Sequence, residues 1–308
     1  MSDYFDGFDR SEIGSRLALA FRDLADSAAE PDEGLYGQIR RVTVGSLMLS
    51  TDAGFDIEFS IPFDDDPEIN ESTVEIFNLN RTDVQQITPG APIIVEAGYA
   101  NDSYGQILNG KVVSVRNYWD GLDHITEITC NDYNGTADTE VKDMSFPPGM
   151  AASQILRELV NLLGIPVAVF QVPEDHTYEQ AVKIDGSVMD AVRKYAKACS
   201  VSAWINRSSL YVCPLSQAIS DGYVDLSAAT GLLSVEEWQE TEKSEDPDGE
   251  DKIINGITTK MLLQHRVYTG CTVVLNSRNV SGQFKVREGS HSAEGTEMTT
   301  TVKAVRMG

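Results

Sequence analysis

The sequence contains few basic residues. It has 24 Lys and Arg against 48 Asp and Glu, which gives its 308 residues a net charge of −24 at pH 7. Protein affinity for nucleic acid depends mainly on Lys and Arg contacts to phosphates, so this balance excludes electrostatic binding of DNA or RNA. Acidic walls repel phosphate. The charge therefore suits either an ordinary soluble surface or a passage that nucleic acid crosses without adhering.

Long apolar runs and paired cysteines are also missing. No stretch of 18 apolar residues occurs, so no membrane span is expected, and the acidic N-terminus predicts no signal peptide. The four cysteines show no CxxC spacing, which predicts buried free thiols in a protein that folds in a reducing cytoplasm: Cys130, Cys199, Cys213 and Cys271.

Motifs for catalysis are absent as well. The chain has no GxSxG, no Walker A sequence and no GxGxxG after a strand, and its four histidines are too scattered for a zinc motif. His291 within "GSHS" is no nucleophile–base pair, because triads assemble across a fold. Glycosidases use a pair of carboxylates. Asp132 beside Tyr133, or Glu236–Glu237 beside Trp238, can be imagined as part of such a pair with a sugar-stacking aromatic residue. With 48 acidic residues such neighbours arise by chance, so no enzyme is predicted.

Two acidic loops offer oxygen ligands for calcium. They are "DDDPEIN" at 64–70 and "DPDGED" at 246–251, and neither has the EF-hand pattern with glutamate at its twelfth position. Both are interpreted as solvated turns. The sequence predicts no metal and no cofactor.

The first 34 residues form an acidic segment with one predicted helix. Ser11 is a suitable N-cap and Pro31 a suitable stop. Four apolar residues fall on one helical face, either to pack on their own domain or to dock on a partner: Ile13, Leu17, Phe21 and Leu24.

In residues 35–146, apolar and polar residues alternate along the chain, as they do in half-buried antiparallel strands. In "GFDIEFSIPF", Phe55, Ile57, Phe59 and Ile61 point one way, and Asp56, Glu58 and Ser60 the other. At least five further strands are separated by Gly, Pro and Asp turns. So many strands in about 100 residues predict a closed or nearly closed β-barrel. Between two of them, "NLNRTDVQQITPG" predicts a short helical turn.

Residues 147–200 form a small α/β insert in this interpretation. The first predicted helix has an apolar face and ends at Gly164: Ala152, Ile155, Leu156, Leu159, Leu162 and Leu163. The second is capped by Ser187 and buries Val188, Val192, Tyr195 and Ala196.

Residues 201–308 return to β structure. "VSAWIN" and "SSLYVCP" predict a hairpin, and strands follow on both sides of an acidic loop at 242–251. The chain is thus predicted to be mainly β (α+β). Burial is expected for its three tryptophans, Trp119, Trp204 and Trp238.

The order of these parts resembles the baseplate hub family of contractile phage tails and related injection systems, often called late control protein D-like. "STVEIFNLNRTDVQQITPGAPIIVEAGY" is similar to the first tube-like domain of that family, "ILNGKVVSVRN" to its next strand, and "MAASQILRELVNLLGIPV" to its insert. "GQFKVREGSHSAEGTEMTTTVKAV" is similar to the end of its second domain. The likeness covers residues 36–308 and leaves the first 34 residues and the acidic loop unmatched.

This resemblance implies two tube-protein-like antiparallel β-barrel domains and a structural role without catalysis. It implies a homotrimer that forms a pseudo-six-fold ring between the tail tube and the central spike, with tail tube, spike, baseplate wedge and tape measure proteins as partners. DNA can pass through the lumen, without sequence-specific binding. Asp56 and Glu58 are candidates to line that lumen, and Ile13, Leu17, Phe21 and Leu24 to dock on a neighbour. The expected location is the virion tail baseplate, assembled in the host cytoplasm.

Three other functions stay open. The first is the same tube fold used elsewhere, in a siphophage tail tip or at the base of a type VI-like spike. The remaining two are of different classes. One is a tail-tip adhesin, which the few scattered tryptophans do not favour. The other is a cell-wall-degrading tail enzyme, although no lysozyme-like or peptidase-like segment is evident. Clearing of peptidoglycan in a zymogram would identify such an enzyme.

Overall fold

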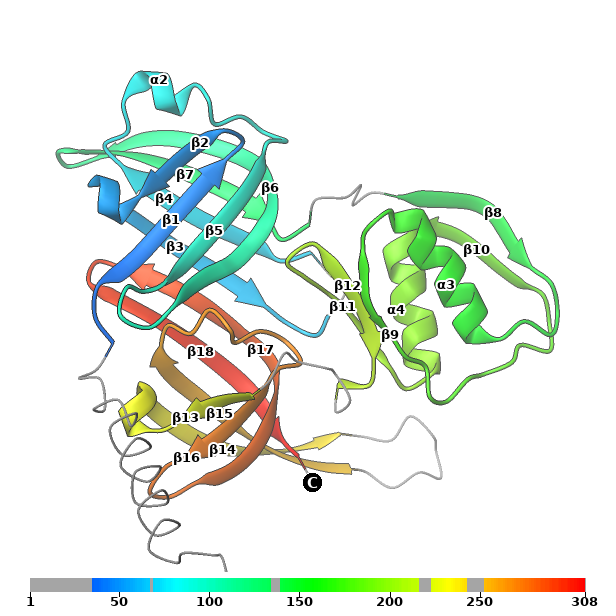
Figure 1. Ribbon diagram of the computed structural model, residues 1–308. Helices are drawn as coiled ribbons and strands as arrows, with labels where there is room; N and C mark the ends of the chain where they lie inside the picture. Colours follow the sequence, from blue (N-terminus) through cyan, green and yellow to red (C-terminus); the bar gives the residue numbers. More distant parts are fainter. Residues whose placement is uncertain (1–34, 67–68, 134–138, 216–222, 243–251, 308) are drawn as a thin grey trace, which may run out of the picture. The chain divides into compact units, whose positions relative to one another are not determined.

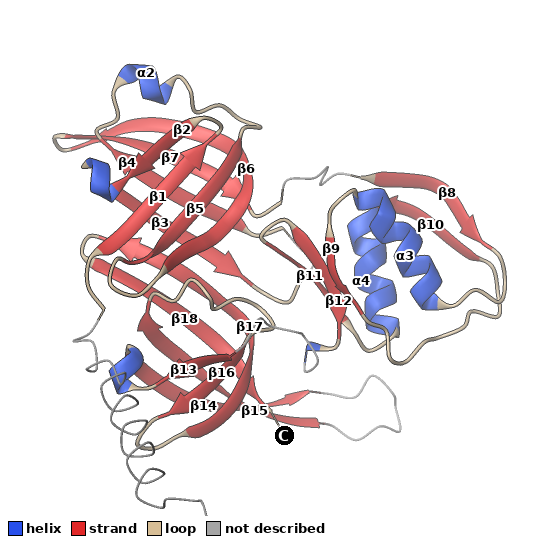
Figure 2. Ribbon diagram, viewed as in Figure 1, coloured by secondary structure: helices blue, strands red, loops and turns tan. Residues whose placement is uncertain are grey.

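The computed structural model describes residues 35–66, 69–133, 139–215, 223–242 and 252–307. The chain divides into two compact units, Met1–Leu35 and Tyr36–Gly308, and every described helix and strand lies in the second. The protein is mainly β, as predicted, with one large, mostly antiparallel sheet and two small ones among the described residues (Figure 2).

The first β-region contains seven strands. They are β1 (Gln38–Val44), β2 (Leu47–Ser50), β3 (Ile57–Phe63), β4 (Glu71–Phe77), β5 (Pro92–Tyr99), β6 (Tyr104–Asp120) and β7 (Asp123–Asn131), with a 3-10 turn, η1 (Thr51–Ala53). The predicted helical turn is α2 (Arg81–Val84), at the edge of this region in Figure 1. The Asn80 side chain caps it by accepting from the backbone N–H groups of Thr82 and Asp83.

The last β-region contains six strands among the described residues. They are β13 (Tyr223–Leu226), β14 (Leu232–Glu242), β15 (Lys252–Leu262), β16 (Thr272–Asn276), β17 (Ser281–Glu294) and β18 (Glu297–Arg306), with a 3-10 turn, η3 (Ala228–Thr230).

One sheet runs through both β-regions. Its main path is β14-β15-β18-β17-β3-β4-β7-β6-β5-β1-β2, and β13 and β16 join at β17. Strand β17 connects the two β-regions. Its first part pairs with β16, and its later residues pair with β3, where His291 lies opposite Ile61. The path is open, so the closure of each region into a barrel stays a prediction.

The insert has its own core. Its elements are β8 (Glu140–Phe146), α3 (Ala152–Leu163), β9 (Val167–Phe170), β10 (Val182–Ser187), α4 (Val188–Ala198), β11 (Ser202–Asn206) and β12 (Ser209–Cys213). The strands β8 and β10 form one small sheet, and β11, β12 and β9 another. The predicted hairpin is confirmed as β11–β12. Its residues Ala203, Ile205, Leu210 and Val212 share the core of α3 and α4, whereas Trp204 and Cys213 form a separate cluster. This differs from its predicted grouping with the second β-domain; the domain boundaries stay a prediction.

Most predicted core positions are confirmed. Ile57, Phe59 and Ile61 alternate inward on β3. Helix α4 begins after the Ser187 cap and buries its four predicted residues, and α3 ends at Gly164 with φ 66°. Leu162 is a wrong prediction: it is 44% exposed, and Val160 is buried instead.

Candidate assembly surfaces

The carboxylates considered for hydrolysis are either buried or exposed on a strand, and they are not arranged as a catalytic pair. Asp132 is buried just after β7, and desolvation raises the pKa of its carboxyl to about 7. The hydroxyl of Tyr133 donates to the backbone oxygen of Leu163 at 3.2 Å. Glu236 and Glu237 are exposed neighbours on β14, whose side chains point to opposite faces, and Glu237 pairs with Arg306. Asp132 is followed by a tyrosine and not by a second carboxylate, and the side chains of Glu236 and Glu237 point apart, so neither sequence neighbourhood presents two facing carboxylates.

His291 and the cysteines belong to the core. The His291 ring lies within hydrogen-bonding distance of the Thr300 hydroxyl (2.9 Å) and the Val267 carbonyl (3.1 Å), and burial lowers its pKa to about 3. The ring is therefore neutral at physiological pH. All four cysteines are buried and free, which confirms that prediction.

Among the described residues, no group of three or more His, Cys, Asp or Glu could hold a metal ion. The loop at 64–70 is described except for 67–68, and the loop at 246–251 lies outside the described residues. Within the described ranges, no helix has both the length and the apolar character to cross a membrane.

The lumen candidates lie beside a buried arginine. Asp56 is exposed, and Glu58 is half-buried and accepts from the backbone N–H of Gly295 at 2.7 Å. Arg40 donates to the carbonyls of Ile57 (2.8 Å) and Gly295 (2.7 Å). Burial lowers the pKa of Arg40, and the charges of Asp56 and Glu58 oppose that effect. Glu58 thus helps to hold the β17–β18 turn against the first β-region; whether either carboxylate faces a lumen stays a prediction. Ile13, Leu17, Phe21 and Leu24 lie outside the described residues.

The two β-regions are joined by more than the sheet. The Tyr99 hydroxyl donates to the Met298 carbonyl at 3.2 Å, and Arg287 pairs with Asp65 at 3.2 Å. These contacts, with the Arg40 bonds, reinforce the β17–β3 pairing. The two regions are therefore one mechanical unit.

The turn between β11 and β12 joins the insert to both β-regions. Arg207 and Ser208 have φ values of 49° and 61°, the left-handed conformation that side chains disfavour. Ser208 donates from its hydroxyl to the Asn109 carbonyl at 2.7 Å, and Arg207 donates to the His265 carbonyl at 2.5 Å. Contacts to both regions hold this strained turn in place.

The prediction from the sequence did not identify one exposed apolar surface. The tip of the β6–β7 hairpin exposes Trp119, predicted to be buried, and Leu122. Trp204 is buried as predicted, and Trp238 is half-buried under the Lys303 ammonium. The sequence did carry a signal: Trp119 lies two residues before Gly121, which begins a two-residue turn. The last residue pairs of a long hairpin, next to its turn, extend past the core, so a tryptophan there is exposed.

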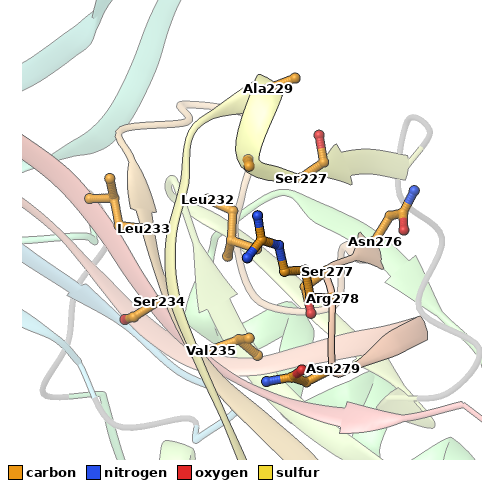
Figure 3. Close-up of a pocket in the computed structure, with 11 residues that line it drawn as sticks. Ser227, Ala229, Leu232, Leu233, Ser234, Val235, Asn276, Ser277, Arg278 and Asn279 are labelled. Atoms are coloured by element: carbon orange, nitrogen blue, oxygen red, sulfur yellow. The ribbon is translucent and has the colours of Figure 1, made fainter.

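A pocket lies beside β14, the strand at one end of the sheet order. Its volume is about 770 Å³, and residues from η3, β14 and the loop after β16 line it (Figure 3). Its lining is largely apolar around one cation, Arg278.

Comparison with known proteins decides the family. A sequence model of the baseplate hub gp41 family matches residues 69–244, more than half of the chain. This chain belongs to the baseplate hub gp41 family. A search of curated protein sequences found no match.

Solved structures of tail proteins share the fold of this baseplate hub chain. The 43 kDa tail protein of prophage MuSo2 from Shewanella oneidensis aligns with TM-score 0.62 and 11% identity, covering 88% of this chain and 98% of that one. The tail protein of Neisseria meningitidis MC58 gives 0.59 and 12%, covering 88% and 97%. The E. coli c3393 protein gives 0.58 and 8%, covering 87% and 77%; it is described as a type VI secretion component similar in structure to the T4 tail proteins gp27 and gp5.

The family assigns this chain a structural role in a phage tail baseplate. The tail proteins of Shewanella oneidensis and Neisseria meningitidis share the fold of this chain. The predicted resemblance to a baseplate hub family is confirmed.

Proposed function

We propose that three copies of this chain form a ring that joins the tail tube to the central spike and encloses the conduit, without catalysis. Each copy supplies two β-regions, so three copies present six. A three-fold ring can then meet a six-fold tube on one side and a three-fold spike on the other. Tail tube, spike, wedge and tape measure proteins are its proposed neighbours.

The observation that carries this proposal is the pairing of β17 with β3. It makes one continuous sheet from two β-regions that are far apart in the sequence. The buried Arg40 bonds and the Arg287–Asp65 pair fasten the same connection. A ring that transmits force needs such stiffness within each subunit.

The acidic charge supports a conduit for nucleic acid. With a net charge of −24, a lumen wall repels phosphate and lets DNA pass. Asp56, which is exposed, and Glu58 beside it are proposed to face that lumen. The apolar face of Ile13, Leu17, Phe21 and Leu24 is proposed to dock on a neighbouring baseplate or tube protein.

The test is the absolute mass of the purified full-length chain, measured by light scattering over a range of concentrations. Three copies of 33.7 kDa give about 101 kDa. A mass that reaches and stays at this value supports the ring, and a plateau at two or four copies contradicts it. A peptidoglycan zymogram of the same sample is expected to show no clearing.

A further inference from the structure

The tip of the β6–β7 hairpin exposes two large apolar side chains. Trp119 is 71% exposed and Leu122 is 94% exposed. Beyond Val112, β6 pairs only with β7 among the described strands, and the pairing of β4 on β7 ends at Ile125. A tryptophan has a large apolar surface, and its exposure next to a leucine marks an interaction site.

The tip is rigid. Asn78, with φ 57°, donates from its backbone N–H to the His124 carbonyl at 2.7 Å, and its side-chain oxygen Oδ1 accepts from the His124 backbone N–H at 3.0 Å. Its side-chain amide donates to Asp123 at 2.8 Å. The Trp119 ring meets the His124 ring edge-on, with 5.1 Å between centroids. A tip held in this way loses little conformational entropy on binding.

The turn itself orients Leu122. Asp120 pairs with Asp123, and Gly121 is the first of the two turn residues with φ 60°. Glycine first, with positive φ, is typical of a type II′ turn, which matches the twist of the two strands. Leu122 therefore occupies the outermost point of a regular hairpin.

The pocket at η3 and β14 has the complementary character. Leu232, Leu233 and Val235 of β14, with Ala228 and Ala229 of η3, give it an apolar lining. Leu233 is 52% exposed at its edge. Its volume of about 770 Å³ is large enough for an indole and a leucine side chain together.

The charges at the two surfaces are opposite. Asp120, at the tip, and Arg278, in the pocket, are both exposed, and neither has an ionic partner among the residues that the structure describes. Figure 3 shows the Arg278 side chain extending toward Leu232. An acidic partner is favoured beside this cation, and Asp120 is next to the exposed tryptophan.

We propose that the β6–β7 tip of one copy inserts into the η3–β14 pocket of a second copy, with Asp120 paired to Arg278. This inference rests on the proposed ring. Tip and pocket are different surfaces, so the contact is head-to-tail; such contacts form a closed assembly when the rotation between copies closes the ring, here after three copies.

Disulfide cross-linking of the full-length protein tests the contact directly. The variants are Leu122→Cys at the tip and Leu233→Cys at the pocket edge; the four native cysteines are buried and do not interfere. Mixing the two single variants under oxidation is expected to give covalent dimers, and the double variant covalent trimers. Each single variant alone is expected to give neither.

Substitutions test the energetics. Trp119→Ala is expected to weaken association about thirty-fold, as truncating a central aromatic anchor does. Leu162→Ala is the control, because it removes an exposed apolar side chain from α3 and leaves association unchanged. Asp120→Arg is expected to weaken association, and adding Arg278→Asp to restore it.

The outcomes separate this contact from the ring itself. A trimer that forms equally well with Trp119→Ala, and that gives no cross-link, overturns the contact but leaves the ring. A wild-type chain that stays monomeric overturns both. If a tail tube protein binds the tip and Trp119→Ala leaves the trimer unaffected, the proposal that the tip binds a second copy of this chain is also overturned.

Discussion

At the scale of single residues, Asp132 makes stability depend on pH. The residue is 6% exposed, and burial raises the pKa of its carboxyl from 3.8 to about 7. The side chain and backbone of Asn70 oppose part of this shift, and the charge of Asp64 adds to it. One carboxylate oxygen has no hydrogen-bond donor among the described residues. Between about pH 4 and pH 7, Asp132 is therefore protonated in the folded chain and ionised in the unfolded chain.

Asp132→Asn is expected to stabilise the protein at high pH. Because the folded pKa is raised, the free energy of unfolding falls as pH rises from about 4 to about 7, by at most about 4 kcal/mol, and stays low above that. The variant cannot ionise, so it should match the wild type near pH 4 and exceed it at pH 8. Urea denaturation at both pH values measures this. Asp225→Asn, at an exposed site, is the control; parallel pH profiles for wild type and Asp132→Asn would contradict the prediction.

Adjacent arginines on β1 should differ in their contribution to stability. Arg40 is 3% exposed and donates to two carbonyls that have to be satisfied, whereas Arg41 meets Glu96 at 3.5 Å near the surface. Arg40→Met is expected to lower the free energy of unfolding by about 2–4 kcal/mol, because it leaves buried acceptors unpaired. Arg41→Met is the matched control, with less than about 1 kcal/mol expected. Equal losses in chemical denaturation would mean that the Arg40 bonds do not fasten the junction.

Residue-level prediction from the sequence succeeded where neighbours along the chain decide burial. The inward positions of β3 and α4 follow from periodicity alone. Trp119 was mispredicted because its burial depends on where β4 and β5 end, and these strands are distant in sequence. Leu162 was mispredicted because the buried arc of α3 is rotated toward Val160.

At the scale of elements, helix α3 has only half of a capping box from its own sequence: the Gln154 side chain accepts from the Ala151 backbone N–H at 3.1 Å. Ala151 occupies the N-cap position and offers no side-chain acceptor. Asp175, from the loop after β9, accepts from the Ser153 backbone N–H at 3.0 Å and also from the Ser153 hydroxyl. A carboxylate that is remote in sequence therefore accepts from an otherwise unpaired N–H of the first helical turn, and its negative charge interacts favourably with the helix dipole.

Asp175→Ala is expected to destabilise the chain by about 1 kcal/mol, the usual contribution of a helix cap. Ala151→Asp in the same background should recover much of that loss, since it supplies the missing acceptor locally. Melting temperatures from circular dichroism measure both. Glu179→Ala, an exposed carboxylate on the same loop, serves as the control. If Ala151→Asp gives no recovery, the Asp175 contribution is not capping.

The elements themselves were largely predictable, and their pairing was not. The α2 turn, both insert helices and the β11–β12 hairpin follow from caps, turns and periodicity. The union of β17 with β3 joins residues more than 200 positions apart, and nothing local specifies it. The same holds for the strained Arg207–Ser208 turn, which is held by contacts to both β-regions.

At the scale of the whole molecule, the family match gives the chain a structural role in a phage tail baseplate. The family match begins at residue 69, so the first residues are unassigned by it. The chain divides at the same end, into Met1–Leu35 and Tyr36–Gly308. The second unit contains all three described core clusters. Its stability should therefore not depend on the first 34 residues.

Deletion of residues 1–34 is expected to leave a folded protein that fails to assemble. The melting temperature should change by less than about 2 °C, because the cores of the second unit are intact. Co-purification with baseplate or tube proteins should be lost, since the deleted segment carries the apolar face of Ile13, Leu17, Phe21 and Leu24. A full-length variant with all four changed to Ser is the matched control and should behave like the deletion. A truncated chain that unfolds would instead assign the predicted helix to the core of its own subunit, where its loss removes buried apolar area and lowers the free energy of unfolding.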